Sequence, residues 1–334
     1  MGSVKQSSEP KAQSSISYEL ARCAVCGGAD AAEIAGPEDL RQETELLWQF
    51  HGRRLLPHTP PDRLIDRVAF SQPPPWRVVR CRSCGLVYRN PVEKRNVLRE
   101  TYAEAVPPRG ALHALHRSQS TAYRAQMHRL SRHLGTGRAA GLEVGSYVGA
   151  FLAATRSGRW RFEGLDVNPR VNAFVRSLGF VVHDGELEHY SPGRQFDAVV
   201  IWNTFDQLAD PRAAARAASR LLRPDGVLAI RVPNGACYTR WRRWLNTRSS
   251  RAMAVEVLAH NNLLTFPYRF GFSPASLTRL LNDVGFRVVE TVRDVLVPTT
   301  DEWTKRWARA ESRLVKPLTR LWAPWFEIYA RNAA

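Results

Sequence analysis

Apolar runs and amphipathic segments alternate along the second half of the chain. From residue 140 onward, short apolar runs are separated by longer segments in which apolar residues recur every three or four positions. The first pattern is typical of buried strands and the second of helices, so their alternation predicts an α/β fold. We expect a seven-stranded, mostly parallel sheet with helices on both faces. The predicted strands cover residues 141–144, 161–166, 180–183, 196–202, 227–232, 286–291 and 325–331, and the predicted helices begin near 149 and cover 169–178, 211–222 and 274–283.

The pattern before residue 140 is weaker. The first residues are rich in Ser, Gln and Lys with few apolar positions, which is typical of a disordered tail. Leu40, Leu47 and Phe50 recur near helical spacing and predict one helix over residues 37–55. The sequence therefore predicts a disordered tail at 1–19, a small module at 20–92, a helical linker at 93–139 and the α/β domain at 140–334, with an insertion at 233–272.

Four of the five cysteines form two pairs of equal spacing, Cys23 with Cys26 and Cys81 with Cys84. Two thiols separated by two residues sit on a tight turn that presents both sulfurs to one zinc ion, and two such turns complete a tetrahedral site. Two disulfides would need an oxidising compartment, and a redox dithiol would need only one pair. We therefore expect a structural Zn²⁺ in a zinc-ribbon-like module, because four protein ligands leave no position for water.

Residues with binding chemistry follow the first four predicted strands. They are Glu143, Gly145 and Gly149 after the first strand, Asp166 after the second, Asp184 and Glu186 after the third, and Asn203 and Asp206 after the fourth. The carboxyl ends of parallel strands meet at one edge of a sheet, and ligands bind outside that edge. A carboxylate at the position of Asp166 can accept both ribose hydroxyls of an adenosine.

The loop after the first strand argues against a dinucleotide cofactor. A nicotinamide or flavin site needs the spacing G-x-G-x-x-G, whereas this loop has Gly145 and Gly149 separated by three residues, with Tyr147 in the middle. Glu143 would also repel a phosphate. The loop suits a cofactor that carries adenosine and a cationic aminoacyl tail but no phosphate.

Residues from about 140 to 331 resemble a class I S-adenosylmethionine-dependent methyltransferase, which has a Rossmann-like sheet. The motifs that carry the resemblance follow the family's order: E-V-G-x-x-x-G at 143–149, Asp166, F-D-A-V-V at 196–200 and L-L-R-P-D-G at 221–226. The segment 81–91, with the earlier cysteine pair, resembles the zinc-binding module of a bacterial subgroup that includes sugar C-methyltransferases. The resemblance implies methyl transfer to a small-molecule acceptor, such as a sugar or natural-product intermediate, including phosphorylated or nucleotide-linked ones.

The resemblance also assigns roles at the first strand end. Gly145, Tyr147 and Gly149 would form the loop beside the methionine part of the cofactor, with Glu143 as a partner through the loop or water. Asn203, after the fourth strand, would face the same crevice.

The adenosine part of the cofactor would be held after the second and third strands. By the same resemblance, Asp166 would bind the ribose and Val167 would pack on the adenine. Glu186 would accept a hydrogen bond from the adenine amino group, unless Asp184 takes that place. Leu187 would supply a backbone amide and an apolar contact.

The sequence departs from the family at two positions. Members usually have a further glycine where Tyr147 stands, and many have a Glu-His pair where this chain has Asp206 and Gln207. In the sugar C-methyltransferases that His is a candidate general base, and Gln cannot take a proton at neutral pH. We therefore consider Asp206, and His260 and Tyr268 in the insertion, as candidate catalytic residues, because His titrates near neutrality.

The chain carries 48 basic and 31 acidic residues, a formal net charge of +17. Such a charge attracts nucleic acid, anionic lipid or phosphorylated substrates without distinguishing them. One alternative is therefore an rRNA or tRNA methyltransferase, although residues 202–205 lack the Asn/Asp-Pro-Pro-aromatic motif used on flipped bases. A second alternative is a non-catalytic relative that only binds the cofactor, which Tyr147 and the missing Glu-His pair would suit.

No apolar run approaches the ~20 residues that span a bilayer, and no apolar stretch follows the first Lys residues. We therefore expect a cytoplasmic protein. Residues 303–325 combine Trp with Arg and Lys. They could form a helix that binds a membrane surface or a partner. We favour a helix whose aromatic residues cover the sheet while its cations face water.

Overall fold

The computed structural model describes residues 18–60, 76–104, 106–156, 158–261, 269–295 and 302–333. Its largest element is a seven-stranded sheet with the order β12-β13-β10-β9-β6-β7-β8. The strands are β6 (Ala139–Val144), β7 (Trp160–Asp166), β8 (Val182–Asp184), β9 (Phe196–Trp202), β10 (Leu222–Pro233), β12 (Phe286–Asp294) and β13 (Trp325–Asn332). Only β13 runs antiparallel to its neighbours in this sheet. The predicted mostly parallel α/β sheet is confirmed.

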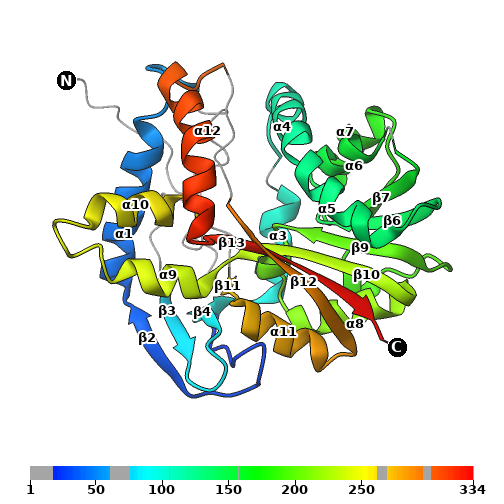
Figure 1. Ribbon diagram of the computed structural model, residues 1–334, viewed down its shortest axis with the longest axis horizontal. Helices are drawn as coiled ribbons and strands as arrows, with labels where there is room; N and C mark the ends of the chain where they lie inside the picture. The colour runs from blue at the N-terminus through cyan, green and yellow to red at the C-terminus, as the bar shows by residue number, and fades with distance from the viewer. Residues whose placement is uncertain are drawn as a thin grey trace.

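Helices cover both faces of the sheet (Figure 1). One face packs against α4 (Arg109–Ala122), α5 (Arg124–Leu134), α6 (Ala150–Thr155) and α7 (Pro169–Ser177), and the other against α8 (Pro211–Leu221) and α11 (Pro274–Asn282). Successive residues of β9 enter opposite cores: Val200 packs on the first face and Ile201 on the second. Because both faces are covered, β9 is apolar from Ala198 to Trp202, after Asp197 near its start.

The N-terminal residues build a second, four-stranded sheet with the order β11-β4-β3-β2. Its strands are β2 (Ala31–Ala35), β3 (Arg77–Cys81), β4 (Val87–Asn90) and β11 (Phe270–Gly271). The strand β11 comes from the later half of the chain and pairs antiparallel with β4. A short pair, β1 (Tyr18–Glu19) with β5 (Val92–Glu93), lies at the end of this region. The two halves of the chain therefore share one sheet.

Helices from distant parts of the chain pack beside the N-terminal sheet. Residues of α1 (Pro37–Gly52), α9 (Gly235–Arg242) and α10 (Arg251–Ala259) share one apolar core with β3. Figure 1 shows these elements on the left, across the carboxyl edge of β9 and β10 from α3 (Arg95–Glu104) and α4. The segment that the sequence marks as an insertion thus joins α1 to the edge where the predicted site lies.

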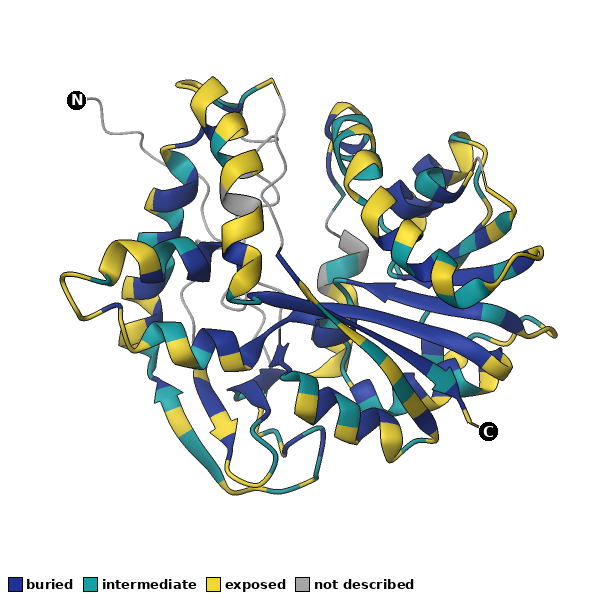
Figure 2. Cartoon of the chain, viewed as in Figure 1, coloured by how far each residue is buried: buried dark blue, intermediate teal, exposed yellow. Residues whose placement is uncertain are grey.

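The helix α12 (Arg306–Leu321) differs from its expected packing. Most of its length is exposed in Figure 2, and Leu314, Leu318 and Leu321 are solvent-exposed rather than packed on the sheet. The favoured interpretation was that the aromatic residues of this segment cover the sheet. Trp307 of α12 is instead 47% exposed, and Trp322 packs on Trp241 rather than on the sheet. Glu311 of α12 pairs with Arg54, which follows α1. Within the described ranges, no helix is both long and apolar enough to cross a bilayer.

Candidate functional site

The loop after β6 reverses direction through three left-handed residues. Gly145, Tyr147 and Gly149 have φ values of 73°, 40° and 68°. A Cβ atom on Gly145 would lie 2.2 Å from the Thr204 hydroxyl oxygen, so only glycine fits there. Tyr147 adopts a φ that glycine tolerates more readily, which explains in physical terms why relatives place glycine at this position. The loop brings β6 and the segment after β9 into direct contact.

Asp166, at the end of β7, holds this loop. Its Oδ2 accepts a hydrogen bond from the Tyr147 backbone N–H at 3.0 Å, and its Oδ1 accepts one from the Asn168 N–H at 3.0 Å. Burial raises the pKa of the Asp166 carboxyl, although the backbone donors at Asn168 and Tyr147 counteract this effect. The sequence analysis assigned Asp166 and the loop to one site, and in the structure the two are in direct contact.

Glu143 lies beneath the loop and is almost fully buried. Burial raises its pKa well above the ordinary value, and the charge of Asp166 adds to the effect. Its Oε2 has no hydrogen-bond partner among the described residues. A buried acceptor without a partner costs free energy, so this atom fits a donor group on a ligand.

The third strand end carries the predicted adenine-binding residues. Glu186 lies at 2.9 Å from Arg95 Nη2, and Leu187 is buried at the start of a short 3₁₀ helix. Val167, which follows Asp166, is half-buried. Asp184, the competitor for the Glu186 role, is tied to α7 through the Asn172 side chain at 2.7 Å. The sequence did not predict the contact of Arg95 with Glu186, because the two residues are 91 positions apart.

Asn203 begins the segment after β9 in a left-handed conformation with φ of 57°. Its Oδ1 accepts a hydrogen bond from Arg231 Nη1 at 2.8 Å, and its Nδ2 donates to the Tyr123 hydroxyl at 3.4 Å. Arg231 is buried on β10 and bonds Asp294 Oδ2 at 2.6 Å. Arg231 and Tyr123 therefore orient Asn203, and neither was predicted as a site residue.

Asp206 lies three residues further along and is completely buried. Neither carboxylate oxygen has a hydrogen-bond partner in the described part of the chain. Burial raises its pKa well above the ordinary value, and the charge of Arg89 opposes this only in part. Burial therefore favours the protonated form of Asp206.

Two buried arginines lie next to Asp206. The Arg269 N–H donates to the Asp206 carbonyl at 3.0 Å, and the Arg89 N–H donates to the Arg269 carbonyl at 3.1 Å. Arg269 Nη2 bonds the Glu93 carbonyl, while its Nε and Nη1 have no recorded partner in the described ranges. Burial lowers the pKa of Arg89 to about 10, with Arg269 contributing and Glu93 opposing. The backbone bonds thus place Arg269 and Arg89 in the same buried cluster as Asp206, where the charge of Arg89 acts on its carboxyl.

The other two candidate catalytic residues are not joined to this cluster by any described contact. His260 is buried at the end of α10, with Nε2 at 3.4 Å from Glu256 Oε1 and its ring edge-on to Phe50 of α1. These neighbours belong to the packing of α1 against α10. Tyr268 lies outside the described residues.

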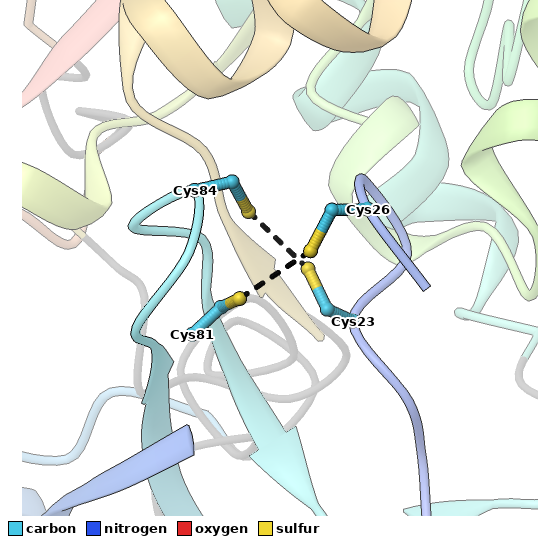
Figure 3. Close-up of side chains that lie close together, drawn as sticks. All are labelled: Cys23, Cys26, Cys81 and Cys84. Atoms are coloured by element: carbon cyan, nitrogen blue, oxygen red, sulfur yellow. Dashed lines mark hydrogen bonds between the residues drawn. The ribbon is translucent and has the colours of Figure 1, made fainter. Parts of the chain in front are cut away.

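The four paired cysteines converge on one point (Figure 3). Their four sulfur atoms lie within 4.8 Å of one another, with Cys23 and Cys84 at 3.3 Å and Cys26 and Cys81 at 3.5 Å. Each pair sits on a tight turn that ends in a left-handed glycine, Gly27 or Gly85. Sulfurs around a tetrahedral zinc with ~2.3 Å bonds are about 3.8 Å apart. The cluster is therefore compatible with zinc binding.

The sequence model of a family described as a methyltransferase domain matches residues 115–291. No curated protein sequence matches the chain. Similar solved structures include a chain of the Haloferax volcanii complex between the Trm112 methyltransferase activator and a methyltransferase, with 17% identity over 73% of this chain and 100% of that chain and a TM-score of 0.47.

Two further structures are similar over parts of the chain. The amino pentose methyltransferase CalS10 of Micromonospora echinaspora is 30% identical over 35% of this chain and 54% of its own, with a TM-score of 0.32. The N-methyltransferase NodS of Bradyrhizobium japonicum is 18% identical over 65% of this chain and 97% of its own, with a TM-score of 0.39.

The raised pKa of Asp206 predicts a pH dependence of stability. The folded state binds one more proton than the unfolded state between the unfolded pKa of ~3.9 and the raised folded pKa, so stability falls as pH rises through that interval, by about 1.4 kcal/mol per unit of pKa difference. Asp206→Asn, which stays neutral, should remove this decline in urea unfolding measured from pH 4 to pH 8. Exposed Asp225→Asn is the control and should keep the full decline. Because the buried Glu143 adds a decline of its own, the assignment is contradicted if the slope in Asp206→Asn equals that of the wild type.

Proposed function

The chain belongs to the methyltransferase family whose domain matches residues 115–291, and from this premise we propose that it transfers a methyl group from S-adenosylmethionine to a small-molecule acceptor. The observation that carries the proposal is the carboxyl edge of the sheet, where Asp166 bonds the 145–149 loop above the buried Glu143. A left-handed loop, a strand-end carboxylate and an unpartnered buried acceptor suit a cofactor with ribose hydroxyls and a cationic amine.

The strand-end residues would hold the cofactor. Gly145, Tyr147 and Gly149 would form the loop beside its methionine part, and the free Oε2 of Glu143 supports a bond to the amino group, directly or through water. The cofactor supplies an activated methyl group on a sulfonium. The protein then contributes proximity, alignment and control of the acceptor proton.

The adenosine part is assigned to the next two strand ends. Asp166 would accept from the ribose hydroxyls, and Val167 and Leu187 would contact the adenine. We favour Glu186 over Asp184 as the acceptor for the adenine amino group, because Asn172 and Arg176 hold the Asp184 carboxylate against α7.

We expect Asp166→Ala to weaken cofactor binding by roughly thirtyfold, about 2 kcal/mol, because charge-assisted hydrogen bonds to the ribose are lost. Isothermal titration of the full chain with S-adenosylmethionine measures this. Asp283→Ala, on the solvent side of α11, is the matched control and should leave the affinity unchanged. Unaltered affinity in Asp166→Ala would place the cofactor elsewhere, and no binding by the wild-type chain would contradict the cofactor assignment as a whole.

Asp206 is the strongest of the three catalytic candidates. It is buried next to the Asn203 segment, and burial raises the pKa of its carboxyl, which is the direction that suits a group exchanging a proton with the acceptor. His260 contacts Phe50 of α1 and Glu256 of α10 rather than the residues around Asp206. Gln207, at the position of the base in sugar C-methyltransferases, accepts a hydrogen bond from the Tyr102 hydroxyl at 2.9 Å. This arrangement supports a positioning role for Gln207 rather than proton transfer.

The acceptor that the site suits best carries an anionic group. Arg269 is buried, and two of its N–H-bearing nitrogens lack partners in the described chain. Arg89 adds a second positive charge in the same cluster. Guanidinium groups recognise phosphate and carboxylate through paired hydrogen bonds. We therefore favour a phosphorylated or nucleotide-linked sugar, or a natural-product acid, as the acceptor class.

We expect methyl transfer to nucleotide-linked sugars at a rate at least tenfold above that to the corresponding free sugars, measured with radiolabelled S-adenosylmethionine. Arg269→Gln should raise the KM for the anionic acceptor at least tenfold, because one charge-assisted contact is worth about 1.5–3 kcal/mol. Unchanged cofactor affinity in this variant shows that the fold is intact. Equal rates for free and nucleotide-linked sugars would contradict the anionic acceptor.

We also propose that the four-cysteine cluster binds one structural zinc ion, as in the amino-terminal module of the sugar C-methyltransferase subgroup. The support is the donor set itself, four sulfurs from two glycine-terminated turns within 4.8 Å of one another. A metal there would fix β3 and the N-terminal segment against α8 and α11, whose apolar residues share a core with Cys23 and Cys81.

Metal analysis of the purified chain should find one zinc per molecule. The Cys81→Ser/Cys84→Ser variant should lose the metal and lower the Tm by about 5–10 °C, because metal binding energy contributes directly to folding. Cys237→Ala, which removes the fifth cysteine, is the control and should retain one zinc. A wild-type chain that holds no zinc would show that the cluster serves another purpose.

A further inference from the structure

The exposed face of α12 is the largest apolar feature that the fold leaves uncovered in the described chain. Trp307, Leu314, Leu318 and Leu321 expose 47%, 73%, 59% and 65% of their surface. At 100° per residue these four positions fall within about 60° of one another on the helix. They therefore form one continuous apolar stripe, defined here as the α12 stripe.

The same helix buries a different, narrow face. Ala308 and Thr319 are fully buried, and Glu311 pairs with Arg54 of the segment after α1. The Arg54 guanidinium also lies over the Trp307 ring, 5.7 Å from its centroid, so this contact holds α12 in place at the Trp307 end of the α12 stripe and uses none of the three leucines. Large exposed leucines cost free energy in water, so a stripe of this kind marks a surface for another molecule.

Positive charge occupies the remaining side of α12. Arg306, Arg309, Arg313 and Arg320 are exposed, and none of them has an acidic partner within the described residues. An apolar stripe beside unpaired cations is the composition of a helix that lies in a membrane interface, where leucine and tryptophan enter the acyl boundary and arginine meets anionic headgroups.

The segments next to α12 carry exposed side chains of the same kinds. Trp322, at the end of α12, packs on Trp241 of α9 at a centroid distance of 5.3 Å. Beyond α9, the exposed side chains of Trp244 and Met253 add apolar area, and Arg243 and Arg248 add charge. The net charge of +17 gives the whole molecule the same preference for an anionic surface.

We propose that the α12 stripe and its flanking arginines bind the surface of an anionic lipid bilayer. The helix lies on the membrane and does not cross it. The commitment to lipid rather than a protein partner rests on charge complementarity: four arginines on one helix have no acidic partner among the described residues and suit a sheet of phosphate headgroups, although Arg309 and Arg320 each bond a backbone carbonyl. The stripe lies beside the carboxyl edge of the sheet, since β13 begins opposite Pro233 at the end of β10.

Co-sedimentation of the full chain with large unilamellar vesicles tests the proposal. We expect binding to vesicles of phosphatidylglycerol and phosphatidylcholine mixed 3:1, at least tenfold weaker binding to pure phosphatidylcholine, and a marked loss of binding when NaCl is raised from 0.1 to 0.5 M. Leu314→Glu/Leu318→Glu should weaken binding to the anionic vesicles at least tenfold. Arg306→Gln/Arg313→Gln should weaken it at least fivefold.

The control is Val181→Glu/Val289→Glu, which adds two acidic residues at exposed apolar positions away from α12. It should bind vesicles as the wild type does, and thermal melting should show that all variants fold. No binding to anionic vesicles, or equal binding by Leu314→Glu/Leu318→Glu and wild type, would overturn the proposal. So would a dimer that forms without lipid and dissociates in Leu314→Glu/Leu318→Glu, because the α12 stripe would then face a second copy of the chain.

Discussion

The hydrogen bond from the Tyr147 N–H to Asp166 is the interaction around which the candidate site is arranged. It fixes the point at which the chain leaves β6 and turns back through Gly145 and Gly149 into α6. Thr204 packs closely on Gly145, so the segment after β9 contacts the same loop. One backbone turn therefore sets the relative positions of the ends of β6, β7 and β9. The positions of the candidate binding residues at these ends depend on it.

A second constraint ties this edge to the N-terminal residues. The strand β11 pairs with β4, and Arg269 next to it reaches both the Asp206 carbonyl and Glu93. The cysteine turns pack into the core beneath α8 and α11. Loss of order in the N-terminal sheet would consequently disturb the backbone contact between Arg269 and Asp206. The four-sulfur cluster thus supports the proposed acceptor side of the site without contacting it.

The buried charges at this edge are held by partners from distant parts of the chain. Arg231 bonds Asp294 and orients Asn203, while Gln126 and Arg129 of α5 bond Glu327 of β13. Such a network is costly to bury and is satisfied only in one arrangement of the strands. It specifies how the antiparallel β13 and the edge strand β12 join the parallel part of the sheet.

The sequence by itself determined the strands, the helices that alternate with them and the two cysteine turns. A strand buried on both faces is mostly apolar, as β9 is from Ala198 to Trp202, and a tight two-ligand turn requires its own spacing, so both signals are local. The acidic and glycine residues at the strand ends were also visible, because parallel topology places successive ends at one edge.

Tertiary structure decided which distant groups meet. In a chain rich in arginine, the sequence does not distinguish the three arginines of the site, Arg231, Arg95 and Arg89, from the others. Only the packing shows that they are buried or paired there. The helical pattern of α12 predicted an apolar face but not what covers that face. In the structure Leu314 is exposed, and Thr319 lies on the buried face of the helix. The physical reason is the same in each case: burial and pairing depend on contacts between residues far apart in sequence, which a local pattern does not contain.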